Sequence, residues 1–262
     1  MKITFLTILF TLSFLTLPSQ AETTHIAVAS NFTVTMKALI SAFEKASPHK
    51  IKASYGSSGK IYAQIKHGAP FQIFFSADQE KPAALYKERV TQSRPFTYSY
   101  GALALWSSQT EFRQQEIVRL KSGEFNKLSL ANPKLAPYGI AALEVLEQME
   151  LVESTRNKWI KGENIAQTYQ FVGTGNADLG FVALSQVINK TDYWLVPSNL
   201  HNAIRQDAVL LKSGQKNAAA KAFIKFIGSK QSQDIIESYG YSYDGFDDMN
   251  KPVLENNTGL GK

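Results

Sequence analysis

Two pairs of small polar residues stand where an apolar segment gives way to a helical pattern. Ser30 and Asn31 follow the first apolar run after the N-terminal region, and Ser57 and Ser58 follow the next. Hydroxyl groups and the free backbone N–H groups of a helix start are hydrogen-bond donors, and a helix start also carries about half a unit of positive charge. These two junctions therefore predict a site that binds an anion.

Two further junctions of the same kind lie later in the chain. The segment 132–139 contains two prolines and leads into a helical pattern, and Asn164 and Ile165 open another. Each junction offers backbone donors at a helix start, with Tyr138 and Ile165 closest to it. The alternative interpretation of all four junctions is an ordinary N-cap that contacts no ligand.

The elements that must position these donors alternate along the chain. Short apolar runs typical of strands are separated by stripes with helical spacing,. This alternation predicts an α/β protein with mainly parallel strands. The expected strands cover 26–30, 51–55, 72–76, 102–106, 128–131, 179–183 and 208–211, and the clearest helical stripes cover 36–43, 142–149, 165–172 and 219–226.

The length of the chain, 262 residues, predicts two lobes rather than one sheet,. We expect the chain to cross into the second lobe near 98–101 and to return near 197–206. The expected division is a signal peptide at 1–21, lobe I at 22–100 plus 201–245, lobe II at 101–200, and a loosely held tail at 246–262.

The N-terminal region predicts export. Lys2 is followed by an apolar run, and Ser19-Gln20-Ala21 fits a cleavage site after Ala21,. A membrane anchor is the rival interpretation, but the apolar run is shorter than the ~20 residues that a span requires. The chain has no cysteine, so it lacks disulfides and a lipid-modified cysteine,. We therefore expect a soluble periplasmic protein.

The charge pattern argues against a nucleic-acid partner. The formal net charge of +6 is not gathered into a dense basic block,. We expect a monomer with a solvated, mildly basic surface. Lys60, close to Ser58, could steer anions toward a site, and we prefer to interpret it as solvated.

Several blocks of sequence resemble the periplasmic molybdate-binding proteins of ABC importers. In the first half they are Ala29-Ser-Asn-Phe-Thr33, Tyr55-Gly-Ser-Ser-Gly59, the segment 64–70 and the segment 75–79. The segments 132–139 and 175–185 continue the resemblance, which covers essentially the whole mature chain. Its first-half motifs are more specific than those of the second half.

The resemblance implies a two-lobed periplasmic-binding-protein fold with mixed sheets, whose ligand cleft lies between lobes joined by two crossing segments. It implies a non-enzymatic protein that captures molybdate or tungstate and delivers it to ABC permease subunits at the inner membrane, without a cofactor and without a bare metal ion. The residues that would hold the anion are Ser30, Asn31, Ser58 and the backbone N–H groups of Tyr138 and Ile165.

One position departs from part of that family. Some members place a tyrosine hydroxyl on the anion where this chain has Ala183. We expect Asn31 to supply the missing contact.

Two other functions stay open at this point. The first is binding of another tetrahedral oxyanion, such as sulfate. The second is a secreted serine hydrolase that uses Ser30 or Ser58 as its nucleophile, which would require a base beside the serine. The four histidines stand in no recognisable catalytic or metal-binding motif, and there is no Gly-x-Ser-x-Gly sequence,.

Overall fold

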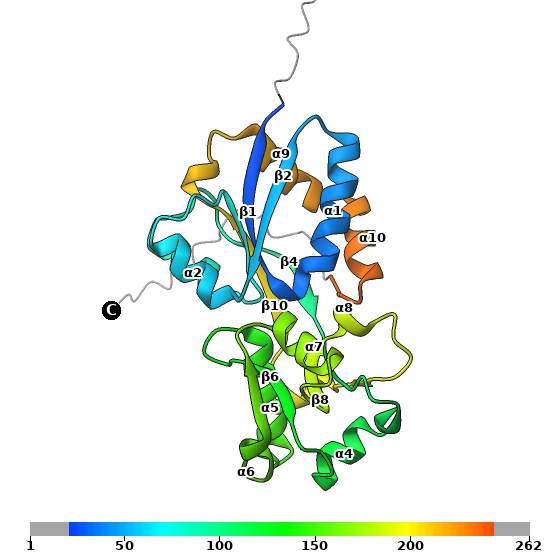
Figure 1. Ribbon diagram of the computed structural model, residues 1–262. Coiled ribbons are helices and arrows are strands. Elements are labelled where there is room, and N and C mark those ends of the chain that lie inside the picture. The colour runs from blue at the N-terminus through cyan, green and yellow to red at the C-terminus, as the bar shows by residue number, and fades with distance from the viewer. Residues whose placement is uncertain (1–20, 244–262) are drawn as a thin grey trace, which may run out of the picture.

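The computed structural model describes residues 21–243, which form two bodies, each built on its own five-stranded sheet (Figure 1). We call them the first lobe and the second lobe. The expected signal peptide, apart from Ala21, and the expected tail at 246–262 lie outside the described residues. Within the described part of the chain, no helix is both long enough and apolar enough to cross a membrane.

The sheet of the first lobe has the strand order β2-β1-β3-β10-β4. β1 runs parallel to β2 and β3, whereas β10 runs antiparallel to β3 and β4. Successive side chains of a strand point to opposite faces. Ile26 and Val28 of β1 accordingly enter one apolar core and Ala27 enters another. The strands are β1 (Thr23–Ala29), β2 (Lys50–Gly56), β3 (Ile73–Phe75), β4 (Phe96–Gly101) and β10 (Ile204–Leu210).

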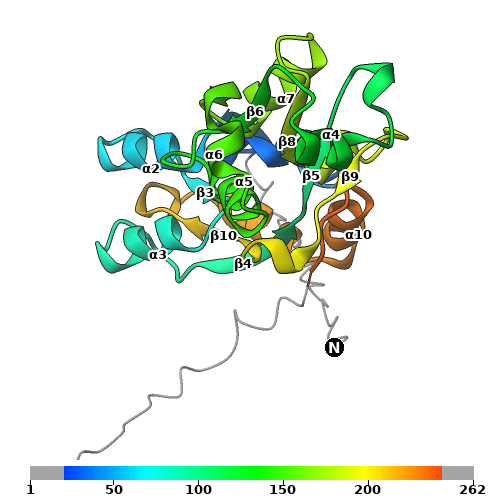
Figure 2. The same cartoon turned by 90° about the horizontal axis from the view of Figure 1, so that it is seen from below.

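Helices cover both faces of this sheet, as Figures 1 and 2 show. One face packs against α1 (Thr33–Ala46), α9 (Ala218–Ile227) and α10 (Lys230–Ser238). The other face packs against α2 (Ser58–Lys66) and α3 (Glu80–Lys87). The apolar residues of the middle strands are therefore buried on both sides of the sheet,.

The sheet of the second lobe has the strand order β7-β6-β8-β5-β9. β6 runs parallel to β7 and β8, and β5 runs antiparallel to β8 and β9. The strands are β5 (Leu103–Trp106), β6 (Leu128–Ala131), β7 (Trp159–Gly162), β8 (Leu179–Ala183) and β9 (Trp194–Leu195). The helices are α4 (Glu116–Ser122), α5 (Pro137–Gln148), α6 (Val152–Thr155), α7 (Ile165–Gly173) and α8 (Leu184–Val187).

Short 3₁₀ turns complete the chain. They are η1 (Ser30–Phe32), η2 (Thr110–Phe112), η3 (Arg156–Lys158), η4 (Ser198–Leu200) and η5 (Lys212–Gly214). Only η1 matters for the site, because it joins the end of β1 to the start of α1.

The expected α/β fold with mixed sheets is confirmed, and the expectation of mainly parallel strands is wrong. Four of the eight strand pairings are antiparallel. Helical crossovers predict parallel neighbours. The antiparallel pairings all involve β10 or β5, which adjoin the passages between the lobes, and no helical crossover precedes either strand.

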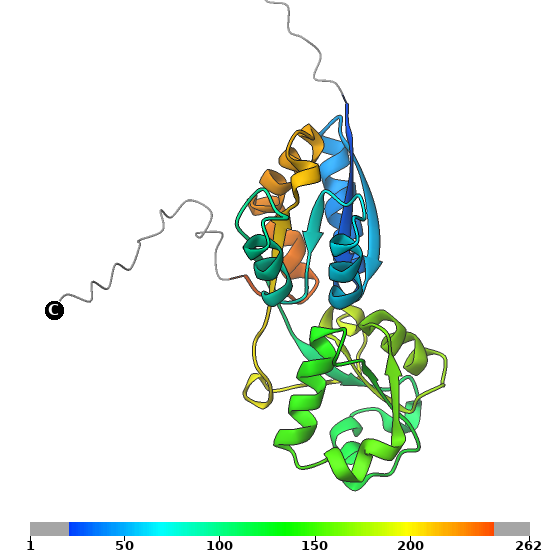
Figure 3. The same cartoon turned by 90° about the vertical axis from the view of Figure 1, so that its left-hand side faces the viewer.

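The chain passes between the lobes twice, and Figure 3 shows both passages from the side. It leaves the first sheet after Gly101 and enters β5 at Leu103, and it returns through residues 196–203, between β9 and β10. The segment 98–101, which we expected to be a connection, is therefore the end of strand β4. Strands β7 and β9 were also missed, because the first is only half-buried and the second has two residues.

Candidate functional site

The five residues that the sequence singled out lie together at one small cavity between the lobes. Ser30, Asn31 and Ser58 line it from the first lobe, and Tyr138 and Ile165 line it from the second. The remaining lining residues are Ala29, Gly56, Ser57, Ala77, Ala136 and Pro137. Its volume is about 10 Å³, far below the ~300–1,000 Å³ of sites for drug-sized molecules. This volume is about the space of one water molecule, so a sugar or a peptide does not fit.

Ser30 and Asn31 form the first turn of η1, directly at the end of β1. Both are buried, with 6% and 3% of their surface exposed. Backbone N–H groups in a first turn have no intrahelical acceptor. The hydroxyl of Thr33 donates to the carbonyl oxygen of Ser30 (2.7 Å) and so polarises the peptide group that carries the N–H of Asn31,.

Ser58 is held as a donor by a neighbouring strand end. The backbone N–H of Ala77 donates to Oγ of Ser58 (2.9 Å). A hydroxyl that accepts this bond keeps its own hydrogen for another acceptor. We considered capping as the alternative role of Ser58. The N-cap of α2 is its neighbour Ser57, whose side chain accepts from the N–H of Lys60.

Tyr138 lies in the first turn of α5, where Pro137 has no N–H to offer,. The next N–H along, that of Gly139, donates to the carbonyl oxygen of Ala136 (2.9 Å). The N–H of Tyr138 therefore has no intrahelical acceptor, and it lies at the end of α5 that lines the cavity,.

Ile165 is the first residue of α7, and the N-cap of this helix does not accept from its N–H. The side chain of Asn164 accepts from the N–H groups of Ala166 (3.0 Å) and Gln167 (3.1 Å). These are the second and third donors of the helix start, so the cap satisfies both and leaves the first, on Ile165. Asn164 thus organises this part of the site without occupying it.

The side-chain amide of Asn31 donates within the protein. Its Nδ2 donates to Oε1 of Gln206 (2.8 Å) and to the hydroxyl of Tyr241 (3.2 Å). The backbone carbonyl oxygen of Asn31 accepts from Tyr241 (2.9 Å) and from Ser185 of the second lobe (3.1 Å). With Nδ2 committed to these two acceptors, the donor that Asn31 has left for the cavity is its backbone N–H. Ala183, the position of the expected departure, does not line the cavity.

Buried tyrosines surround this network and remain protonated. Burial raises the pKa of Tyr241 to about 12. Burial also raises the pKa values of Tyr98 and Tyr138 well above 10. Their hydroxyls therefore carry their protons at every physiological pH, and they add no negative charge behind the cavity.

The cavity is neutral, and the nearest ion pair lies at its rim. No lysine, arginine, histidine or carboxylate lines it among the described residues. Lys60 is solvent-exposed, as we expected, and it also pairs with Glu163 of the second lobe (3.0 Å). An anion in the cavity would be held by dipoles alone.

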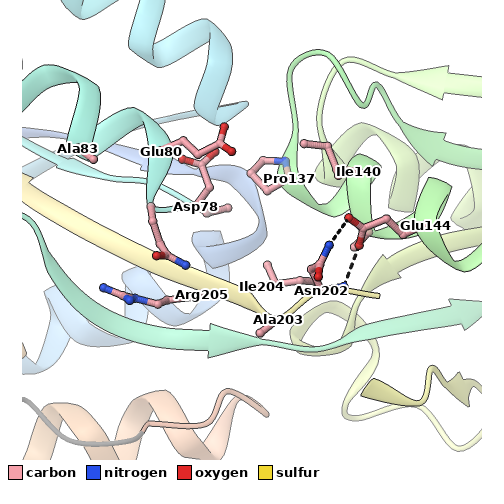
Figure 4. A pocket seen from close by; sticks show the side chains of 13 residues that line it. Asp78, Glu80, Ala83, Pro137, Ile140, Glu144, Asn202, Ala203, Ile204 and Arg205 are labelled. Atoms are coloured by element: carbon pink, nitrogen blue, oxygen red, sulfur yellow. Dashed lines mark hydrogen bonds between the residues drawn. The ribbon is translucent and has the colours of Figure 1, made fainter. Parts of the chain in front are cut away.

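A larger groove between the lobes has the opposite character. It encloses about 380 Å³ and is lined by the start of α3, by α5 and by the returning segment (Figure 4). It carries the carboxylates of Asp78, Glu80 and Glu144, and Glu144 accepts two hydrogen bonds from Asn202 (both 2.8 Å). Arg205 is the one cation among the described lining residues, so the carboxylates leave an excess of negative charge that repels an anion, and the small cavity is the better anion site,.

The geometry does not favour a serine hydrolase. The described residues include all four histidines, and none of them lines the cavity. His25 contacts Ser54 (2.9 Å), His49 accepts from the N–H of Glu22 (3.1 Å), and His67 ends α2. Neither Ser30 nor Ser58 has a base within hydrogen-bond reach among these residues, and a serine nucleophile requires one.

Three groups support the site from segments that are distant in the sequence. They are the N–H of Ala77, which contacts Ser58, and the amide of Gln206 and the hydroxyl of Tyr241, which contact Asn31. A signal in the sequence exists for Ala77 alone, because it lies in the segment 75–79 that contributed to the family resemblance.

Comparison with known proteins gives a consistent picture. The family described as bacterial extracellular solute-binding protein matches residues 24–242. The molybdate-binding protein ModA of Azotobacter vinelandii is 46% identical over 230 residues, which are 85% of this chain and 91% of that protein. The molybdate-binding protein ModA of Rhodobacter capsulatus is 41% identical over 230 residues, 87% of this chain and 91% of that protein.

A solved structure is similar as well. The periplasmic molybdate-binding protein of Azotobacter vinelandii superposes with a TM-score of 0.79 at 33% identity, and the match covers 84% of this chain and 99% of that chain.

Gly139 gives a test of how tightly the start of α5 is seated. Its φ is not positive, so a glycine is needed here for space rather than for backbone conformation. A Cβ there would lie 2.2 Å from the carbonyl oxygen of Ala131. We predict that Gly139→Ala lowers the free energy of unfolding by ~1–3 kcal/mol, because α5 must move off β6.

Urea denaturation measures the change in the free energy of unfolding, and Gly173→Ala serves as the control. A Cβ at Gly173 would meet its nearest neighbour, Trp106, at an ordinary 3.8 Å. Equal stability of the two variants would contradict the close contact between Gly139 and the carbonyl oxygen of Ala131.

Proposed function

This chain belongs to the bacterial extracellular solute-binding proteins, and on that premise we propose that it captures molybdate in the cavity between its lobes and delivers it to an ABC permease. The observation that carries the proposal is the character of the cavity. It is small, it is lined by hydroxyls and helix-start N–H groups from both lobes, and it contains no charged side chain among the described residues.

Such a cavity selects by protonation state. A fully deprotonated oxyanion offers acceptors only, so every donor around it finds a partner. A protonated phosphate would turn an O–H toward another donor, and an unpaired buried polar group costs ~1–3 kcal/mol. The arrangement therefore favours molybdate over hydrogen phosphate at neutral pH.

The number of donors is sufficient for tight binding. A hydrogen bond to a charged group contributes ~1.5–3 kcal/mol. The proposed donors are the N–H or hydroxyl groups of Ser30 and Ser58 and the N–H groups of Asn31, Tyr138 and Ile165. Five such bonds cover the ~8–12 kcal/mol of micromolar to nanomolar affinity, after the costs of association.

Several finer points belong to the same proposal. Tungstate has the same charge and shape as molybdate and is proposed as a second ligand. The protein acts as a monomer in the periplasm after cleavage of its leader after Ala21, and its partner is a permease at the inner membrane. It binds without catalysis and without a cofactor. The division into lobe I (22–100 plus 201–245) and lobe II (101–200) remains part of the proposal.

A thermal-shift panel tests the function. We predict that molybdate and tungstate raise the melting temperature and that sulfate and phosphate raise it much less, because a ligand that binds only the folded state stabilises it. Calorimetry then gives the affinities. Equal shifts with all four anions, or a sulfate shift that exceeds the molybdate shift, would contradict the proposal.

Ser58→Ala tests the donor that Ala77 orients. We predict that molybdate binds roughly 10- to 100-fold more weakly, which corresponds to the ~1.5–3 kcal/mol of a hydrogen bond to a charged group. The buried N–H of Ala77 also loses its acceptor, so the free energy of unfolding should fall by ~1–3 kcal/mol. Ser238→Ala, the same change on the exposed side of α10, should alter neither quantity. Unchanged affinity by calorimetry in Ser58→Ala would remove this residue from the site.

Tyr138→Phe tests whether the second lobe binds through its backbone. The phenol is buried and its oxygen makes no hydrogen bond of ordinary geometry, although it faces Tyr241 and Asn31. We predict that the variant binds molybdate within tenfold of the parent, or ~1.4 kcal/mol. Its stability should be equal or higher, because a buried hydroxyl without a partner is removed. A larger loss of affinity would show that the hydroxyl, rather than the N–H, contacts the anion.

A further inference from the structure

One ion pair joins the two lobes across the rim of the cavity. Nζ of Lys60 lies 3.0 Å from Oε1 and 3.1 Å from Oε2 of Glu163. Lys60 is on α2 of the first lobe, and Glu163 precedes α7 of the second. Of the ion pairs within the described residues, the others each join two groups of the same lobe. This pair can therefore form only when the lobes approach each other.

A backbone contact beside it shows how closely the lobes meet. The N–H of Gly59 donates to the carbonyl oxygen of Leu135 (2.9 Å), again from the first lobe to the second. A Cβ at Gly59 would lie 3.0 Å from that oxygen. The ion pair thus belongs to a continuous seam, made of Gly59, Lys60, Leu135 and Glu163, along the edge of the cavity.

Both charges stand next to proposed anion donors. Lys60 is two residues beyond Ser58 in the same helix, and Glu163 is two residues before Ile165. The cavity itself is lined only by neutral groups. A dianion in the cavity would therefore experience attraction from Lys60 and repulsion from Glu163.

We propose that Lys60 and Glu163 form a charge-neutral latch on the closed cleft, in which Glu163 holds the affinity for the anion below the value that Lys60 alone would give. This inference rests on the proposed function. Closure brings the two charges together and cancels their effects on the dianion. The latch then stabilises the closed form without making the anion too tightly bound to be released to a permease.

The latch makes the two single variants unequal. Lys60→Met removes the link and leaves the carboxylate of Glu163 unopposed beside a dianion, so both changes weaken binding. Glu163→Gln removes the link and leaves Lys60 unopposed, so attraction outweighs the loss of the link and this variant should bind at least as tightly as the parent. A simple surface salt bridge, worth ~0.2–1 kcal/mol, would give both variants the same small loss.

The experiment measures molybdate affinity and dissociation rate for Lys60→Met, Glu163→Gln and the double variant. We expect Lys60→Met to bind at least ~5-fold more weakly than Glu163→Gln, and the double variant to recover part of the loss, as a coupled pair requires. Added salt should strengthen binding in Lys60→Met and weaken it in Glu163→Gln, because salt screens repulsion in the first and attraction in the second.

The chain offers a matched control. Lys66 is on the same helix as Lys60, and it pairs with Glu88 within the first lobe. Lys66→Met and Glu88→Gln make the same chemical changes without touching the seam, and they should leave the affinity unchanged.

The outcomes separate the latch from the proposed function. A parent protein that binds none of the anions in the panel contradicts both. A parent that binds molybdate while Lys60→Met and Glu163→Gln behave alike, or while both behave like the control pair, contradicts the latch alone.

Discussion

Backbone N–H groups at the start of a helix need acceptors, and this requirement organises the interior of the protein. An unpaired buried N–H costs ~1–3 kcal/mol, so a fold normally hides none. Here helix starts from both lobes point at one cavity of about 10 Å³. Neither lobe can satisfy these groups alone once the cleft closes. An ion that offers acceptors on every side satisfies them all, which links ligand capture to closure of the two lobes.

The capping residues divide the donors between the fold and the ligand. Asn164 takes the second and third N–H groups of α7 and leaves the first, on Ile165. Pro137 reaches a similar result in α5 by having no N–H at all,. A proline and an asparagine, placed one residue before a donor, therefore decide which groups face the cavity. Conventional helix chemistry builds the site, and no charged side chain is needed.

Much of this could be predicted from local sequence, because it depends on neighbours along the chain. The strand-to-helix junctions at Ser30 and Ser58 and the helix start at Ile165 are visible as changes of period and polarity. The choice between Ser57 and Ser58 as the cap is not visible, because two adjacent serines are chemically equal and only the backbone conformation separates them.

Contacts between distant segments could not be predicted. Asn31 is 210 residues from Tyr241, and Lys60 is 103 residues from Glu163. No periodicity connects such residues. The direction of β10 was missed for the same reason: its buried residues look the same whether the strand runs parallel or antiparallel to its neighbours,.

The position of Tyr138 has a consequence for how this protein can change over time. Its backbone faces the cavity, while its phenol reaches the passage between the lobes, where a Cβ at Gly101 would lie 2.0 Å from the phenol oxygen. Tyr138 thus lines the cavity and also packs against the passage between the lobes. A substitution that moves the loop before α5 therefore changes the shape of the cavity and the packing at Gly101 together. Descendants of this protein that acquire a different cavity through this loop acquire a different contact between the lobes with it.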